Sequence, residues 1–139
     1  MSDYERVRET NDRFYAAMNA LDIEGMDKVW ADDSEAICVH PGREAILGYE
    51  SIRESWMMIF SATDSMMIAS TNEVITVAGD VAWVVCLETI SIMTEEGLAA
   101  AAAQATNIFR RRGALWRMVV HHASPVPLTP QDEWPDVIN

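Results

Sequence analysis

Positive charge is scarce in this 139-residue chain, which has a single lysine, Lys28, and ten basic residues against 22 acidic ones. The formal net charge is −12 at pH 7. A surface with this excess of carboxylates repels the phosphate backbone of a nucleic acid and the anionic headgroups of a membrane. We therefore expect neither a nucleic-acid partner nor a membrane partner.

Long apolar runs, a basic leader and closely spaced cysteines are also missing. No window approaches the roughly 18 apolar residues that a membrane span needs, and the first five residues, MSDYE, are unlike a signal peptide. Cys38 and Cys86 stand far apart in apolar, strand-like runs. This is typical of buried small side chains in a reduced compartment rather than of a disulfide or a metal motif. The sequence thus predicts a cytoplasmic protein without a metal or another cofactor.

Apolar spacing predicts helices in the first half of the chain and strands in the second. One domain is expected over residues 1–139, with its core at about 5–126. Stripes of helical period cover residues 3–20, 23–30 and 49–61, and a short strand over 35–40 stops at Pro41-Gly42. Strands are predicted at 65–77, 81–93, 104–112 and 115–124, whereas the alanine run at 99–103 fits a helix or a strand. The prolines after residue 124 predict an extended acidic tail over 127–139.

This order of elements predicts an α+β fold, with three N-terminal helices packed in the concave face of a strongly curved, mainly antiparallel sheet. Such a sheet wraps over its helices as a cone with an open mouth. The strand over 81–93 is apolar on both faces, with Val81, Trp83, Val85 and Leu87 on the face that the helices do not cover. A second copy of the chain on the convex face would cover them, so we expect a homodimer.

The pairing of the last two strands can be worked out from one turn. If Gly113-Ala114 is a two-residue hairpin loop, Arg112 faces Leu115 and Asn107 lies opposite Val120. Side chains alternate between the two faces, and the face with the aromatic and sulfur-bearing residues is predicted to be the inner one. Regular pairing places these residues on it: Ala105, Asn107, Phe109, Trp116, Met118, Val120, His122 and Ser124.

Glu88 is predicted to join this inner face. A two-residue turn at 96–97 or 97–98 places it opposite Ala105 or Asn107. The side chains of Glu88, Asn107 and His122 would then lie side by side within an otherwise apolar concavity, as the polar groups of a small-molecule site do. The placement requires regular strands, because one β-bulge would reverse the faces beyond it.

Several short segments resemble a known family. They are WADD at 30–33, VHPG at 39–42, GYESIRESW at 48–56, TNIFRR at 106–111, WRMV at 116–119 and HHASP at 121–125. Together they resemble the SnoaL-like, ketosteroid isomerase-like branch of the nuclear transport factor 2-like (NTF2-like) superfamily, over roughly residues 5–126. This superfamily includes ketosteroid isomerase, polyketide cyclases, scytalone dehydratase and epoxide hydrolases, and also a non-catalytic kinase association domain. A fold with so many functions leaves the activity to be argued from the site.

Histidine and glutamate side chains carry the predicted chemistry. The resemblance implies that His40, just before Pro41, stands where ketosteroid isomerase has its proton-shuttling aspartate, and that Glu88, Asn107 and His122 line the pocket. A histidine can act as an acid or a base near neutral pH. A glutamate on an apolar strand has a raised pKa unless it is paired, and His122 is the expected partner of Glu88.

These arguments lead to a predicted site and a predicted function. The expected catalytic residues are His40, Glu88 and His122, and the expected substrate-binding residues are Tyr15, Trp56, Asn107, Phe109 and Met118. We expect a cofactor-independent acid/base enzyme of isomerase, cyclase, dehydratase or hydrolase type, acting on a small, apolar, carbonyl-containing molecule. The alternative is a non-catalytic ligand-binding or dimeric interaction module of the same fold.

Each of these residues also has a purely structural interpretation. Glu88 and His122 fit a buried polar pair, and His40 fits a strand-end residue without chemistry. His121 is expected to point outward or into a subunit contact. Aromatic and methionine side chains such as Trp56 are typical of a core or an interface, and the arginines at 110–112 are typical of a solvated hairpin end rather than a phosphate site.

Overall fold

The computed structural model describes residues 1–128 and places three helices and six strands there. The helices are α1 (Asp3–Ala20), α2 (Ile23–Val29) and α3 (Tyr49–Ser61). The strands are β1 (Ile37–Val39), β2 (Ile46–Leu47), β3 (Ser65–Ala78), β4 (Val81–Thr94), β5 (Gly97–Arg112) and β6 (Leu115–Val126). The alanine run at 99–103 belongs to β5, where pairing with β4 outweighs the helix preference of alanine. Of the expected tail over 127–139, residues 129–139 lie outside the described residues.

Local chemistry explains where the first two helices begin and end. The Ser2 side chain accepts a hydrogen bond from the Glu5 backbone N–H at 3.1 Å, which caps α1. Leu21 ends this helix in the left-handed conformation, with φ of 51°. Asp22 is the N-cap of α2, but its side chain makes no capping hydrogen bond.

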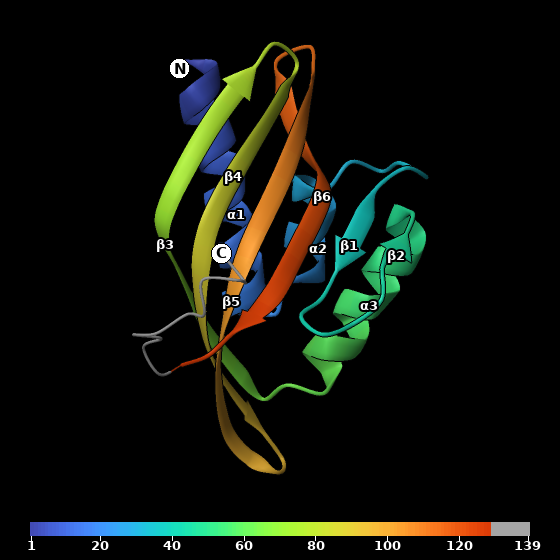
Figure 1. Cartoon of the computed structure of the whole chain (residues 1–139). Helices are drawn as coiled ribbons and strands as arrows, with labels where there is room; N and C mark the ends of the chain where they lie inside the picture. Colours follow the sequence, from blue (N-terminus) through green and yellow to red (C-terminus); the bar gives the residue numbers. More distant parts are fainter. Residues whose placement is uncertain (129–139) are drawn as a thin grey trace.

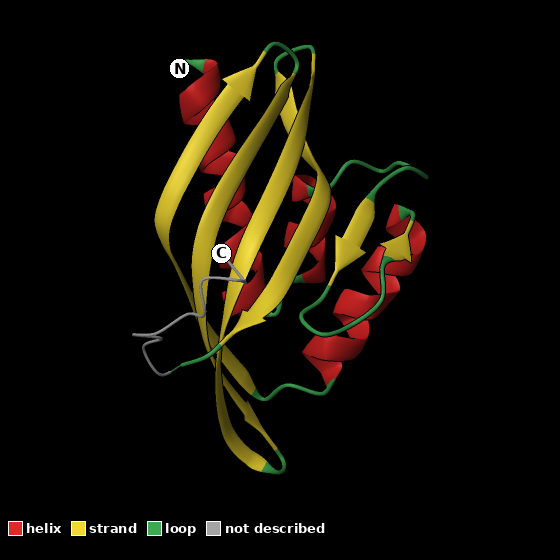
Figure 2. Cartoon of the chain, in the orientation of Figure 1, coloured by secondary structure: helices red, strands yellow, loops and turns green. Residues whose placement is uncertain are grey.

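One mixed, mostly antiparallel sheet holds all six strands that the described residues form, in the order β2-β1-β6-β5-β4-β3. Only the β1–β6 pair within it is parallel. The long strands β3–β6 curl over α1 and α2, whereas α3 lies beside β1 and β2 (Figures 1 and 2). This architecture confirms the predicted α+β fold with a curved sheet around N-terminal helices.

The β4–β5 turn lies slightly earlier than predicted. Thr94 pairs with Gly97, so Glu95 and Glu96 form the turn, and Glu88 lies opposite Ala103 instead of Ala105 or Asn107. The partner changes by an even number of residues, which keeps the faces unchanged. Glu88 therefore does lie on the inner face with Asn107, and the two side chains are 2% and 0% exposed.

A β-bulge overturns the prediction for the outer half of β6. Pairing follows the predicted register from Arg112↔Leu115 to Phe109↔Met118, but the next pair is Ile108↔Val120, which leaves Val119 as an extra residue. The bulge lies between two contacts at the other edge of β6, the isolated bridge of Met118 with Trp30 and the pairing with β1 from Val120 onward. One extra residue reverses every face beyond it.

The histidine pair shows the consequence of this reversal. His121, expected to point outward, is opposite Asn107 on the inner face and 2% exposed. His122, predicted for the site, is exposed on the outer face, as is Ser124. The inner-face prediction is therefore wrong for Val120, His122 and Ser124, and it is right for the residues before the bulge.

Aromatic side chains fill the space between the helices and the sheet. Phe14 packs edge-to-face against both Trp30 and Trp56, with ring centroids 6.3 and 5.7 Å apart. Phe109 and Met118 of the sheet are 0% exposed in the same cluster. Over residues 1–128, no helix is both long and apolar enough to cross a membrane.

Candidate functional site

A cavity of about 850 Å³ lies between α3 and the segment that joins β1 to β2. Its size is in the range of sites for small organic ligands. Mostly apolar side chains line it together with one histidine, one serine and two charged residues: His40, Arg43, Glu44, Ala45, Ile46, Ser55, Met58, Ile59 and Ala62. Of the predicted site residues, His40 is the one that lines this cavity.

A tight turn fixes His40 at the cavity wall. The residue follows the last residue of β1, and its carbonyl oxygen accepts a hydrogen bond from the Arg43 backbone N–H at 3.0 Å. Pro41 and Gly42 are the two central residues of this turn, and Gly42 has φ of +76°, a conformation that favours glycine. The sequence His-Pro-Gly-Arg therefore places the imidazole and the Arg43 side chain at the same cavity.

Hydrogen bonding assigns the proton on the His40 ring. The Ser55 hydroxyl donates to the Ile52 carbonyl oxygen at 2.7 Å, so its oxygen can only accept from His40 Nε2, 3.0 Å away. Nε2 therefore carries the proton, and Nδ1 carries the lone pair. The Cys38 sulfur lies 3.7 Å from Nε2 and 3.9 Å from Nδ1, and its thiol is at most a weak donor to Nδ1.

Burial keeps this imidazole neutral. His40 is 8% exposed, and burial, together with the positive charge of Arg43, lowers its pKa to about 4. Its ring packs edge-to-face on Trp56, with centroids 4.8 Å apart. At neutral pH, Nδ1 is therefore a free base in a mostly apolar cavity.

A second group of polar side chains is buried inside the fold, and Asn107 is its centre. The Asn107 amide nitrogen donates to Asn11 Oδ1 at 2.9 Å and to the Tyr15 hydroxyl at 3.0 Å. Its oxygen lies 2.6 Å from His121 Nδ1, which must therefore be the protonated nitrogen. The Tyr15 hydroxyl then donates to Glu88 Oε2 at 2.7 Å. Donors and acceptors thus alternate without conflict from His121 to Glu88, and we call these five residues the buried network.

The network extends to one exposed carboxylate. The Asn11 amide donates to Glu73 Oε2 at 2.8 Å, and Ser70 donates to the same oxygen at 3.1 Å. Tyr15 is also 3.2 Å from the Cys86 sulfur. These contacts join β3 and β4 to α1, so the network ties the sheet to the helix it wraps.

Burial sets the charge of the titratable network members. It raises the pKa of Glu88 to about 7, although the hydrogen bond from Tyr15 opposes the shift. It lowers the pKa of His121 to about 3, with a smaller effect of the nearby His40 and His122. The imidazole of His121 is therefore neutral at physiological pH, and Glu88 is close to its titration midpoint.

The structure divides the predicted site into two places. Glu88, Asn107 and Tyr15 do come together, but they lie in the buried network and do not line the cavity of His40. The Trp56 ring lies between, with its centroid 4.8 Å from that of His40 and 6.2 Å from that of His121.

The other predicted ligand contacts belong to the core. Trp56, Phe109 and Met118 are at most 1% exposed and pack in the core instead of lining that cavity. His122, exposed on the outer face of the sheet, belongs to neither place nor to the core.

Some residues of these two places were missed although the sequence carries a signal for them. Ser55, Met58, Ile59 and Ala62 recur at helical spacing, which marks a second face of α3 beside the core face. Asn11 stands four residues before Tyr15, a polar residue within the apolar stripe of α1. Over residues 1–128, no three histidine, cysteine, aspartate or glutamate side chains are grouped to hold a metal ion.

A curled sheet over N-terminal helices is the fold of NTF2-like proteins. The family model of the SnoaL-like domain matches residues 7–129. The chain belongs to this SnoaL-like family, as its sequence motifs predict.

Known proteins are similar over most of the chain. A proposed dehydratase of the NTF2-like family from Streptomyces avermitilis is 34% identical, with a TM-score of 0.83 over 90% of this chain and 96% of its own. A proposed association domain of a calcium/calmodulin-dependent protein kinase type II from Thiobacillus denitrificans is 30% identical, with a TM-score of 0.71 over 85% and 93%. The F-box protein SKIP8 of Arabidopsis thaliana is 22% identical over 85% of this chain, and the chain spans about half the length of this curated relative, 48%.

Replacing Glu88 by glutamine is expected to change how stability depends on pH. The folded-state pKa of Glu88 is about 7, above its ordinary value of 4.5, so its protonated form stabilises the fold at low pH and the contribution is lost as the pH rises through 7. Glutamine does not titrate and still offers an oxygen to Tyr15. In denaturant titrations, the free energy of unfolding of the variant, measured relative to that of the unmodified protein, should rise by about 2 kcal/mol between pH 5 and pH 8.

The control for this prediction is Glu96→Gln, which removes a carboxylate from the exposed β4–β5 turn. Its free energy of unfolding should follow that of the unmodified protein across the same interval. If the free energy of unfolding rose equally in the two variants, the burial of Glu88 would not be the cause of the rise.

Proposed function

We propose that the protein is a cofactor-independent proton-transfer enzyme that takes a small, largely apolar carbonyl compound into the cavity of His40. The observation that carries this proposal is the His40 imidazole itself. Its Nε2–H is committed to Ser55, so Nδ1 is the basic nitrogen of a histidine that lines a cavity of about 850 Å³. A positioned, neutral imidazole is the side chain that acts most often as a general base.

The surroundings of His40 suit an enolisation step. His40 Nδ1 takes a proton from the carbon next to the carbonyl group. The electron pair of that C–H bond forms a C=C bond, and the π pair of the C=O bond moves to the oxygen to give an enolate. Arg43 lines the same cavity and supplies positive charge for this oxygen. Burial disfavours the imidazolium that results, so the proton is readily returned to the substrate.

The fate of the enolate decides the reaction type. Return of the proton to a different carbon gives an isomer. If His40 instead gives the proton to a hydroxyl group on the next carbon, that group leaves as water, the enolate electrons form the C=C bond, and the carbonyl group is restored in the dehydration product. The similarity to a proposed dehydratase at 34% identity supports a reaction of this group. Ile46, Met58 and Ile59 favour an apolar skeleton around the carbonyl group.

Small cyclic ketones are suitable probes for this proposal. Saturation-transfer NMR should detect their binding, and exchange of their α-protons in D₂O should be faster with the protein than without it. Ala45→Trp places a large side chain in the cavity from an exposed position, so both signals should disappear while the fold remains. The matched control is Ala69→Trp, at an exposed alanine of β3 that does not line the cavity.

Two outcomes of this experiment would overturn the enzyme proposal. Binding without exchange would favour a ligand-binding module. The absence of both would favour an interaction module, an alternative supported by the tightly filled interior and by the similarity to a proposed kinase association domain at 30% identity.

We also propose that two chains associate through the convex face of the sheet. Val81 and Trp83 are 38% and 37% exposed there, beside the half-buried Val85 and Leu87. Trp83→Glu places a charge in the middle of this apolar face and is expected to convert dimers to monomers in analytical ultracentrifugation. Met57→Glu adds the same charge to an exposed site on α3 and should leave the mass unchanged. A monomeric unmodified protein would contradict the proposal.

A further inference from the structure

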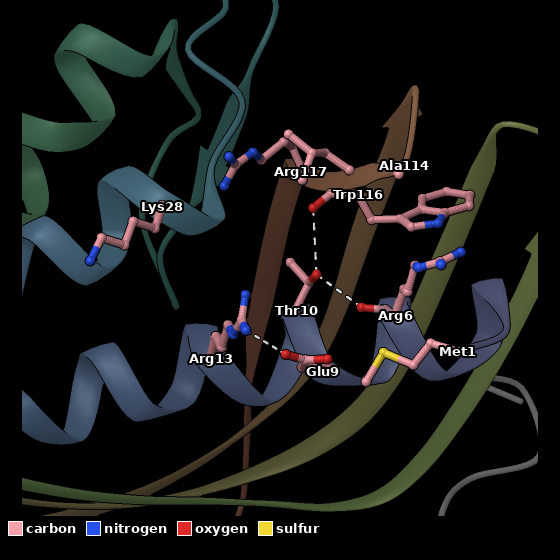
Figure 3. A pocket seen from close by; sticks show the side chains of 10 residues that line it. Met1, Arg6, Glu9, Thr10, Arg13, Lys28, Ala114, Trp116 and Arg117 are labelled. Atoms are coloured by element: carbon pink, nitrogen blue, oxygen red, sulfur yellow. Dashed lines mark hydrogen bonds and ion pairs between the residues drawn. The ribbon is translucent and has the colours of Figure 1, made fainter.

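Positive charge gathers in one place although the chain as a whole is strongly acidic. Four of the ten basic residues, Arg6, Arg13, Lys28 and Arg117, line a single cavity of about 380 Å³. Glu9 is the one carboxylate in the lining, against a formal charge of −12 for the whole chain. Figure 3 shows Arg13 on α1, Lys28 on α2 and Arg117 on β6 around one opening.

Backbone contacts hold the three segments that form this cavity. The Thr10 hydroxyl on α1 donates to the Arg6 carbonyl oxygen at 2.9 Å and lies 3.4 Å from the Trp116 carbonyl oxygen on β6 (Figure 3). Just after α2, the Ala31 N–H donates to the Met118 carbonyl oxygen at 2.9 Å. The cationic side chains therefore project from elements that are fixed relative to one another.

Two of the four cations are not neutralised by a neighbour. Arg13 forms an ion pair with Glu9, and Arg6 lies 3.7 Å from Asp3. Neither Lys28 nor Arg117 forms an ion pair with a carboxylate within residues 1–128. Like charges that share a cavity repel one another. A chain with 22 acidic residues could place carboxylates there, so this excess of positive charge is best explained by an anion that binds to it.

We propose that this cavity binds a small organic phosphate, with Lys28 and Arg117 as the contacts of the phosphate group. An ammonium and a guanidinium group are the side chains that phosphate oxygens prefer. Trp116, Leu115 and Ala114 offer apolar surface to the organic part of the ligand. A nucleic acid is excluded as the ligand, because its long backbone would meet the acidic remainder of the surface. The phosphate cavity shares no lining residue with the cavity of His40.

Pyrophosphate is the probe for this site, because it presents the phosphate oxygens without an organic part. Titration of the ¹⁵N-labelled protein at constant ionic strength should give saturable shifts of amide signals in α1, α2 and the start of β6. Lys28→Ala and Arg117→Ala should each weaken the binding on the order of tenfold. The control is Arg8→Ala, which removes the same charge from an exposed position of α1 outside the cavity and should change the affinity less than twofold.

Three results would overturn the inference. They are shifts that do not saturate, an equal loss of affinity in Arg8→Ala, and shifts at residues outside the three segments. The second would show that a diffuse field, not a built site, attracts the anion. Because the lining of this cavity is separate, its failure would leave the function proposed for His40 untouched.

Discussion

Asn107→Leu is expected to destabilise the fold by about 4 kcal/mol or more, because it removes the centre of the buried network. The Asn107 amide donates to Asn11 and Tyr15 and accepts from His121, and all of these groups are buried. Leucine has a similar size but can make none of these hydrogen bonds. Asn11 Oδ1 and His121 Nδ1–H would be left without partners, and each buried polar group in that state costs about 1–3 kcal/mol. Urea denaturation followed by tryptophan fluorescence measures the loss.

Neighbouring substitutions separate the network from ordinary packing. Thr106→Leu makes a similar change at the adjacent position of β5, on the other face of the sheet, and is expected to alter stability by less than 1 kcal/mol. In the Asn107→Leu background, the further change Asn11→Leu should cost less than it does alone, because its partner is already gone. Additive losses from the two substitutions would show that the hydrogen bond between them contributes little.

Most of the fold could be predicted because the signals for it are local. The helical stripes of α1 and α3 and the turn at Gly113-Ala114 depend on residues that are close in sequence, and the structure confirms each of them. Glu88 and Asn107 were placed on one face by the alternation of side chains, and this also holds. An even shift in register leaves every side chain on the same face. The placement of Glu88 therefore holds, although the β4–β5 turn lies earlier in the chain than predicted.

The bulge at Val119 could not be predicted, because its cause is distant in sequence. It lies where β6 begins to pair with β1, a strand of three residues about eighty positions earlier in the chain. Nothing in the sequence around Val119 differs from a regular strand. The exchange of His121 for His122 on the inner face follows from this single residue.

The separation of His40 from the buried network depends on side-chain volume, which strand arithmetic does not include. His40 directly follows β1 and Glu88 lies in β4, and a hollow cone would let both point into one space. Trp56 and Phe14 fill that space, and the network satisfies its own hydrogen bonds in the buried interior. The function we propose therefore assigns proton transfer to His40 and not to the expected pair of Glu88 with a histidine.

His40→Gln is expected to reduce the protein-catalysed exchange of ketone α-protons by at least about a hundredfold, the usual contribution of a positioned general base. Glutamine can still donate to Ser55 from a similar position, so ligand binding should persist. In the unmodified protein, the exchange rate should rise with pH around a midpoint near 4, the pKa to which burial and Arg43 lower His40. Above that pH the imidazole is already the free base, and the rate should level off.

Ser55→Ala tests the assignment of the proton on the His40 ring. Without the serine oxygen, Nε2–H loses its acceptor, and the ring is no longer held with Nδ1 as the base. The exchange rate should fall on the order of tenfold with little change in ligand affinity, since the serine hydroxyl acts through the imidazole. An unchanged rate in His40→Gln, or a pH midpoint near the ordinary 6.5 of histidine, would contradict the role of this buried imidazole. The pKa of about 7 belongs to Glu88. If the exchange rate had its pH midpoint near 7, and if Glu88→Gln abolished that midpoint, the proton-transfer role would belong to the buried network instead.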